Sequence, residues 1–254
     1  MRTSFKLATA VLGAPALVPL GLSSAFAADG GANANLAPVV LNGVNGSGTA
    51  MVTVKGDVVT VTMAAKGLLA DSPHAAHIHF GADARHECPA ASDDMNKDGH
   101  LTTSEGGPAY GPVVVSLTKT GDTSASSALA VDRFDTAPGG NLTYERGDIT
   151  VAPEVAAAIL AGQAVVVIHG VDYNGDGKYD GTAMSDLDPK LPAEATDPAL
   201  CGVLKAAPVG AMATGMGGAS ASHTDQGLLL AGGALFLAAV GTGTYVVRRA
   251  RTQA

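Results

Sequence analysis

The sequence predicts an all-β domain, folded as a Greek-key sandwich or barrel. Short segments rich in valine and threonine recur along residues 48–205, and glycine or proline separates them. Alternation of apolar and polar residues over such short segments is typical of strands. Seven or more of these segments with turn signals between them indicate an antiparallel β-sandwich or barrel.

The first two strands are expected to form a hairpin. Residues 50–54 and 58–63 flank Lys55-Gly56-Asp57, a short turn that contains glycine. The further strand candidates, in chain order, are 76–80, 113–117, 126–134, 143–151 and 164–169. One short helix is expected over 154–160, because Pro153 suits a first helical turn and Gly162 suits a helix end.

The N-terminus predicts export. Arg2 and Lys6 precede an apolar stretch, and Ala25-Phe26-Ala27 has the small-x-small pattern that a signal peptidase cleaves. Residues 1–27 are therefore predicted to be a signal peptide.

The C-terminus predicts membrane attachment. Residues 227–247 carry no charge, and three arginines follow within residues 248–254. A helix of this length can cross the bilayer, and the arginines place the tail in the cytoplasm and the preceding domain outside. We favour a retained anchor over a wall-sorting signal, because no LPxTG motif precedes the apolar run.

Between these ends, residues 28–47 are expected to form a loose leader, 48–205 the β-domain and 206–226 a flexible stalk. This exported portion contains all 23 acidic residues but only ten of the 15 basic ones, a net charge of −13. The charge argues against nucleic-acid binding and suits a surface that attracts cations. The two cysteines, Cys88 and Cys201, are expected to form a disulfide in an oxidising compartment.

Three separated segments resemble the copper-zinc superoxide dismutase family. His77-Ile78-His79 followed by Cys88 is similar to a strand with two copper ligands and the loop cysteine after it. Residues 165–169 resemble the strand that ends in a further copper-ligating histidine, and residues 200–204 resemble the last strand. The resemblance implies a dismutase-like barrel, a copper site of His77, His79 and His169, and pairing of Cys88 with Cys201.

Two departures from that family argue against dismutase turnover. Residues 89–98 contain no histidine where the family has its bridging ligand, and His100 is the only candidate. No arginine lies in residues 196–200, where the family has the arginine that guides superoxide. The zinc half-site is therefore predicted to be missing.

A second resemblance is to the CHRD (chordin-like) domain. Residues 157–162 lead into a valine-rich strand that ends in His169, and a histidine pair precedes them. That family has no settled chemistry, so this resemblance favours a binding or structural role over catalysis.

The histidines form a candidate copper site. His77 and His79 stand two apart on a predicted strand, so both project from the same face. With His169 they make a three-imidazole set that suits copper or zinc, and copper is favoured by the affinity order. The alternative is a set of histidines left from an ancestral site. His74 and His86 lie in predicted loops and are expected to be exposed.

Residues 94–105 match the twelve-residue EF-hand calcium loop. The oxygen ligands at positions 1, 3, 5 and 12 are Asp94, Asn96, Asp98 and Glu105. Gly99 stands at the sharp turn of position 6, and the carbonyl of His100 serves position 7. No flanking helix is predicted, and the alternative is a solvated acidic loop.

Residues 172–180 repeat the DxNxDG spacing with Asp172, Asn174 and Asp176. Position 12 of this second loop is Ala183, so no glutamate closes it. Candidates to complete the ligand set are Asp180, Asp186 and Asp188, and the alternative is an ordinary polar turn.

The sequence therefore predicts a membrane-tethered, extracytoplasmic β-domain that binds calcium, with copper as the second candidate cofactor. Its expected partners are the membrane and metal cations, and no protein partner is indicated. The competing hypothesis is a copper-only superoxide dismutase that uses His77, His79 and His169, with His100 as a further ligand.

Overall fold

A computed structural model describes residues 29–207 of the chain. The predicted signal peptide, the predicted membrane helix and nearly all of the predicted stalk lie outside these residues. Within residues 29–207, no helix is long and apolar enough to cross a membrane.

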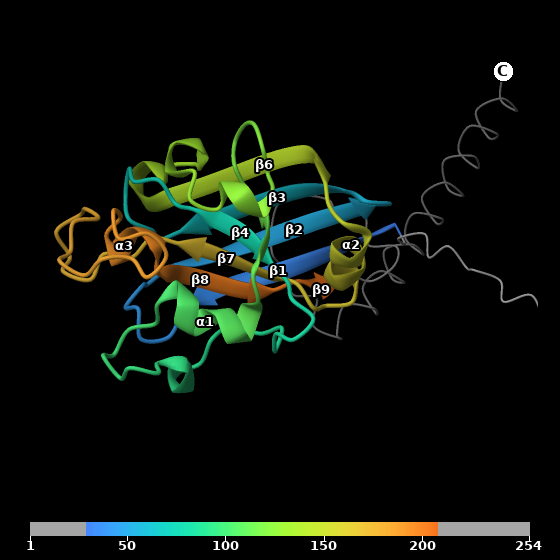
Figure 1. The fold of residues 1–254 in the computed structure, drawn as a ribbon. Helices are drawn as coiled ribbons and strands as arrows, with labels where there is room; N and C mark the ends of the chain where they lie inside the picture. The colour runs from blue at the N-terminus through green and yellow to red at the C-terminus, as the bar shows by residue number, and fades with distance from the viewer. Residues whose placement is uncertain (1–28, 208–254) are drawn as a thin grey trace, which may run out of the picture. The chain divides into compact units, whose positions relative to one another are not determined.

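The described residues form one curled, antiparallel sheet with the strand order β5-β4-β7-β8-β1-β2-β3-β6, and β9 pairs with β1 (Figure 1). The strands are β1 Gly30–Pro38, β2 Ser47–Lys55, β3 Val58–Lys66, β4 Ala76–His79, β5 Val113–Ser116, β6 Asn141–Thr150, β7 Val165–His169, β8 Pro198–Val203 and β9 Lys205–Ala206. The helices are α1 Thr103–Tyr110, α2 Pro153–Leu160 and α3 Ala193–Thr196. The all-β prediction is confirmed. Over residues 29–207 the edge strands β5 and β6 do not pair with each other, so the sheet is curled but not closed by hydrogen bonds.

Several elements lie where the sequence predicts them. The β2–β3 hairpin turns at Gly56, which has a positive φ of 61° that glycine adopts without strain. Helix α2 begins at Pro153, where the missing amide hydrogen costs no helical bond.

The loose leader predicted for residues 28–47 is wrong, because β1 occupies Gly30–Pro38. Ala32, Ala34 and Leu36 are buried in alternation, while β1 pairs with β2 on one side and with β8 on the other. Gly, Ala and Asn have low strand propensity, but a strand with partners on both sides is set by its neighbours.

The strand predicted for residues 126–134 is also wrong. This segment forms two short 3₁₀ turns, Ala125–Ser127 and Val131–Arg133. The carboxylate of Asp122 accepts hydrogen bonds from the hydroxyls of Ser124, Ser126 and Ser127. Such local side-chain bonds compete with a strand ladder and favour a turn.

The side chains on the two faces of strands β4 and β7 belong to two different hydrophobic clusters. Ile78, Val166 and Ile168 belong to the main core, which also contains the inner side chains of β1, β2, β3 and β6. On the opposite face, Val165 and Val167 belong to a second cluster that contains Val39, Leu101, Tyr110 and Cys201. Because residues alternate along a strand, His77, His79 and His169 share this second face.

Candidate metal centre

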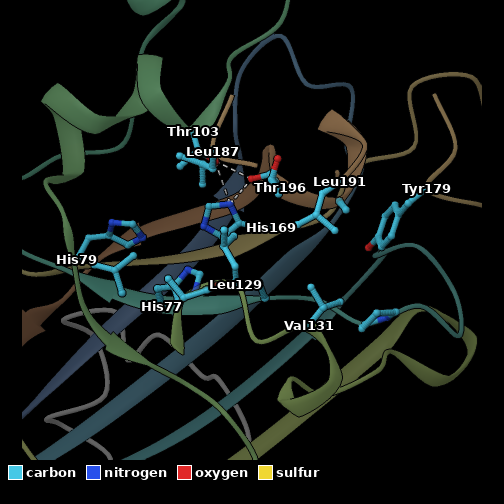
Figure 2. A pocket seen from close by; sticks show the side chains of 15 residues that line it. His77, His79, Thr103, Leu129, Val131, His169, Tyr179, Leu187, Leu191 and Thr196 are labelled. Carbon is cyan, nitrogen blue, oxygen red and sulfur yellow. Dashed lines mark hydrogen bonds between the residues drawn. The ribbon is translucent and has the colours of Figure 1, made fainter. Parts of the chain in front are cut away.

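The structure brings together the three histidines that the sequence predicts. In register, His77 lies opposite Val167 and His79 opposite Val165, while His169 ends β7. One nitrogen from each ring lies within 4.8 Å of the other two. All three side chains are buried, with exposed fractions of 2–4%. Figure 2 shows the three rings on one side of a small cavity.

The hydrogen bonds of the three rings leave a lone pair on the facing nitrogens. His77 Nε2 donates to the carbonyl of Ala128 at 3.1 Å, and His79 Nδ1 donates to the carbonyl of Gly111 at 2.8 Å. His169 Nδ1 donates to the carbonyl of Thr196 at 2.6 Å. The other nitrogens, His77 Nδ1, His79 Nε2 and His169 Nε2, are buried without a partner.

This arrangement fits a metal ion. A neutral imidazole that donates through one nitrogen presents the lone pair of the other, and such an outer bond is the usual way a protein fixes the tautomer of a ligating histidine. Buried polar atoms normally have partners, so three unpartnered nitrogens in one place need an explanation. A bound divalent cation would satisfy all three.

Burial keeps the three rings neutral. Desolvation lowers the pKa of His79 to about 3 and the pKa of His169 to about 4. Burial, with repulsion from His169 and His79, lowers the pKa of His77 well below its usual value. At neutral pH all three rings are therefore in the form that binds metals.

The backbone after His169 is tightly packed. Gly170 has a φ of +109°, and a Cβ there would lie 2.6 Å from the Nδ1 of His74. His74 is itself buried, and its Nδ1 lies 2.8 Å from the carbonyl of His169. The expectation that His74 is exposed is therefore wrong, and this ring supports the end of β7 instead. His86 is half-buried and stacks on Phe80.

His100 does not join the three histidines. Its ring packs on Tyr173 with a centroid distance of 4.1 Å. Within residues 29–207, only His77, His79 and His169 form a group of three His, Cys, Asp or Glu side chains with ligand atoms this close. The prediction of His100 as a further copper ligand is therefore wrong.

The first acidic loop has its carboxylates turned inward onto its own backbone. Asp94 accepts from the amides of Lys97 and Gly99, at 2.6 and 3.0 Å. Glu105 Oε1 accepts from the amides of Met95 and Asn96, at 3.0 and 3.4 Å, although these residues lie at the opposite end of the loop.

The side chains of Asn96 and Asp98 also accept hydrogen bonds from the backbone of this loop. The side chain of Asn96 accepts from the amide of Asp98, and that of Asp98 accepts from the amide of His100.

A helix flanks the first acidic loop, contrary to expectation. Helix α1 begins at Thr103, and a capping box between Thr102 and Glu105 fixes its start.

The second acidic loop repeats this pattern. Asp172 accepts from the amides of Gly175 and Gly177, and Asn174 accepts from the amide of Asp176. The side-chain amide of Asn174 donates to Asp180 at 3.4 Å.

Glu194 of α3 holds the second loop in the way that Glu105 holds the first. Its Oε1 accepts from the amide of Tyr173, at position 2 of the loop, and its Oε2 accepts from the amides of Asp180 and Gly181. Glu194 is 2% exposed. Sequence reasoning missed it because the loop spacing places the closing acid at position 12, and Glu194 lies on a separate helix.

Asn42 is a second residue that sequence reasoning missed. Its amide oxygen accepts from the backbone of Leu101 at 2.7 Å, and its amide nitrogen donates to the carbonyl of the same residue at 2.8 Å. A further bond reaches the carbonyl of Pro198. Asn42 thereby ties the first acidic loop to β8, and no local pattern in the sequence signals this role.

The predicted disulfide is confirmed. Cys88 and Cys201 are bonded and lie 113 residues apart in the chain. Cys201 belongs to β8 and lies opposite Val167 of β7. The bond therefore attaches the segment after β4 to the face that carries the histidines.

A buried carboxyl, Asp197, lies beside the two acidic loops. Its Oδ2 accepts from the hydroxyl of Tyr173 at 2.8 Å, and its Oδ1 has no partner. Burial raises the pKa of this carboxyl to about 7 despite the bond from Tyr173, and the negative charges of Asp186, Asp98 and Glu105 raise it further.

The raised pKa predicts a pH-dependent stability. Because the folded pKa lies above the ordinary value of 3.8, Asp197 contributes full stability below about pH 4 and loses it as pH rises to about 7. Asp197→Asn should remove this loss, so its melting temperature should exceed that of the unsubstituted protein by an increasing margin from pH 5 to pH 8. Calorimetry without calcium measures the difference, and parallel curves for the two proteins would contradict the prediction.

Two solved structures similar to this chain are point mutants of superoxide dismutase 5 from Candida albicans. They are 17% and 16% identical to it, the matches cover 77% of this chain and 99% and 96% of theirs, and the TM-scores are 0.35 and 0.36. No curated protein matches the chain.

The CHRD domain family matches residues 27–177. This range contains the three histidines and the first acidic loop, and it ends before Glu194 and Cys201. Since the match covers more than half of the sequence, the chain belongs to the CHRD domain family.

Proposed function

We propose that this CHRD domain binds copper through His77, His79 and His169 and serves as an exported metal-binding module. The observation that carries the proposal is the convergence of three buried, unpartnered ring nitrogens within 4.8 Å. Nitrogen ligands of this kind suit copper and zinc, and copper binds more tightly in the affinity order of divalent metals.

Hydrogen bonds within the protein preorganise the three histidine rings for metal binding. The carbonyls of Gly111, Ala128 and Thr196 hold the three rings in one tautomer each. Bound copper would supply one-electron redox chemistry. The described residues supply no positive side chain at the cavity to guide an anion to it. This lining supports a binding role over superoxide turnover.

Metal analysis of the full-length protein tests the proposal. After exposure to equimolar copper and zinc followed by desalting, we expect about one copper per chain and a copper(II) resonance spectrum with nitrogen hyperfine lines. Absence of bound copper would refute the proposal. Rapid superoxide turnover by the loaded protein would instead favour the dismutase hypothesis.

We further propose that calcium occupies the two acidic loops. The support is the parallel between them: in each, a glutamate accepts from the amide at position 2 while the first aspartate accepts from the amides at positions 4 and 6. The proposed ligands of the first loop are Asp94, Asn96, Asp98, the carbonyl of His100 and Glu105. Those of the second loop are Asp172, Asn174, Asp176, Asp180 and Glu194. Each loop presents the oxygen atoms that calcium prefers.

Calcium is expected to raise the melting temperature of the protein. A ligand that binds only the folded state stabilises it by about 2.7 kcal/mol at a hundredfold excess over Kd. For a chain of this size that corresponds to roughly 5–10 °C. Glu105→Gln should remove the gain from the first loop and Glu194→Gln that from the second, while Glu145→Gln on the exposed face of β6 should leave both gains. An unchanged melting curve in millimolar calcium would count against both loops.

We also propose that the domain is exported and tethered by residues 227–247. The disulfide supports an oxidising compartment, and the charge pattern of the sequence supports the orientation. Protease added to intact cells should release the β-domain. A domain that stays protected would overturn the orientation.

A further inference from the structure

We propose that the cavity beside the three histidines binds a small molecule that has one metal-binding atom and an apolar body. This inference rests on the proposed copper site and specifies its ligand. The cavity has a volume of about 50 Å³. A single ordered water needs roughly 10–15 Å³ on this scale, so the space suits a ligand of a few non-hydrogen atoms.

The walls of the cavity are apolar. The lining side chains other than the histidines include Val113, Leu129, Val131, Leu187 and Leu191. In Figure 2, Leu129 and Leu187 lie next to the ring of His169, and Leu191 and Val131 lie farther away, toward Tyr179. Among residues 29–207, no charged side chain lines the cavity. An unpaired ion is costly in such surroundings, whereas a hydrocarbon group is stabilised by leaving water.

The other polar groups of the lining are already bonded within the protein. The hydroxyl of Thr103 donates to the carbonyl of Thr196 at 2.6 Å, and the hydroxyl of Thr196 donates to Ser185 at 2.7 Å. The hydroxyl of Tyr179 lies 3.2 Å from the Nδ1 of His74. Among the described side chains that line the cavity, the three histidine nitrogens are therefore the polar atoms left without a partner, and a metal held by them would be their polar contact to a ligand.

The rim of the cavity indicates that it opens to ligands. Leu129, Val131 and Leu187 line it and are also 38%, 36% and 44% exposed. They come from two segments, one between β5 and β6 and one before α3, that both line the cavity. Large apolar side chains gathered at the mouth of a hollow mark a binding site more often than scattered ones do.

A methyl-group comparison tests the inference on the copper-loaded, full-length protein. The probes are imidazole and 4-methylimidazole, both as uncharged bases, and the readout is the shift of the copper resonance and visible absorption during titration. We expect 4-methylimidazole to bind the copper-loaded protein about fourfold more tightly than imidazole, because one more carbon is buried. The affinity ratio of the two probes for aqueous copper is the reference for this gain. Leu187→Asn and Leu129→Asn should each reduce this gain. Val40→Asn is the matched control, because Val40 is 45% exposed and does not line the cavity.

The outcomes separate this inference from the copper proposal. A protein that shows no copper spectrum with nitrogen lines refutes the copper site and the ligand together. A protein with that spectrum, but with a methyl gain no greater than that of aqueous copper, keeps the copper site and overturns the apolar-ligand inference. A methyl gain that Leu187→Asn leaves intact also overturns it.

Discussion

Replacement of His77, His79 or His169 by alanine is expected to weaken copper binding more than a hundredfold. Each ring provides one of the three converging nitrogens, and no fourth histidine of the described residues lies in the group to replace it. Loss of an outer hydrogen-bonding partner alone typically costs 10–100-fold in metal affinity, so loss of a ligand should exceed this range. Calorimetric titration and the copper resonance spectrum measure the effect.

His86 offers a matched control for this experiment. His86→Ala removes a half-buried ring that stacks on Phe80 and lies outside the three-histidine group, so copper affinity should stay unchanged. The calcium response should survive in all of these variants, because the proposed calcium ligands are oxygens of other residues. A His77→Ala variant that keeps wild-type copper affinity would show that the converging nitrogens are not the site.

The parts of the site that the sequence predicts are those set by local periodicity or carried by a resemblance to known families. His77 and His79 share a face because residues two apart on a strand must do so. His169 ends a valine-rich strand that buries both faces, as strands in the middle of a sheet do. The calcium-type spacing of Asp94, Asn96 and Asp98 is likewise local, and the resulting turn geometry follows from it.

The parts that the sequence does not predict depend on contacts between distant segments. Glu194 reaches the second acidic loop from α3, so its partner amide at Tyr173 is 21 residues away. Asn42 bonds to Leu101 across 59 residues. Strand β1 has poor intrinsic propensity and is ordered by its neighbours β2 and β8. In each case the stabilising contacts are tertiary, and the partners lie too far apart in the chain for a local sequence pattern to reveal them.

Loss of the Cys88–Cys201 bond is expected to have the largest effect on stability. The bond closes a loop of 113 residues, and the chain-entropy account gives a loss of about 5 kcal/mol when such a link is removed. The melting temperature should fall by roughly 10–20 °C. The suitable variant replaces both cysteines by alanine. Cys201 is 2% exposed among Val165, Val167 and Leu101, and a serine there would bury a hydroxyl without a partner.

The same change should also weaken copper binding, through the segment that the bond attaches. That segment contains Gly111, whose carbonyl holds the ring of His79, and Leu101, which anchors the first acidic loop to Asn42. When the disulfide is absent, these groups are held only by packing and hydrogen bonds, so the outer support of one ligand becomes mobile and copper affinity should fall by up to 100-fold. Reduction of the unsubstituted protein with dithiothreitol before metal loading should reproduce both effects, and reoxidation should reverse them. If the double alanine variant melts within about 3 °C of the unsubstituted protein and binds copper equally well, the attached segment is held in place by its other contacts alone.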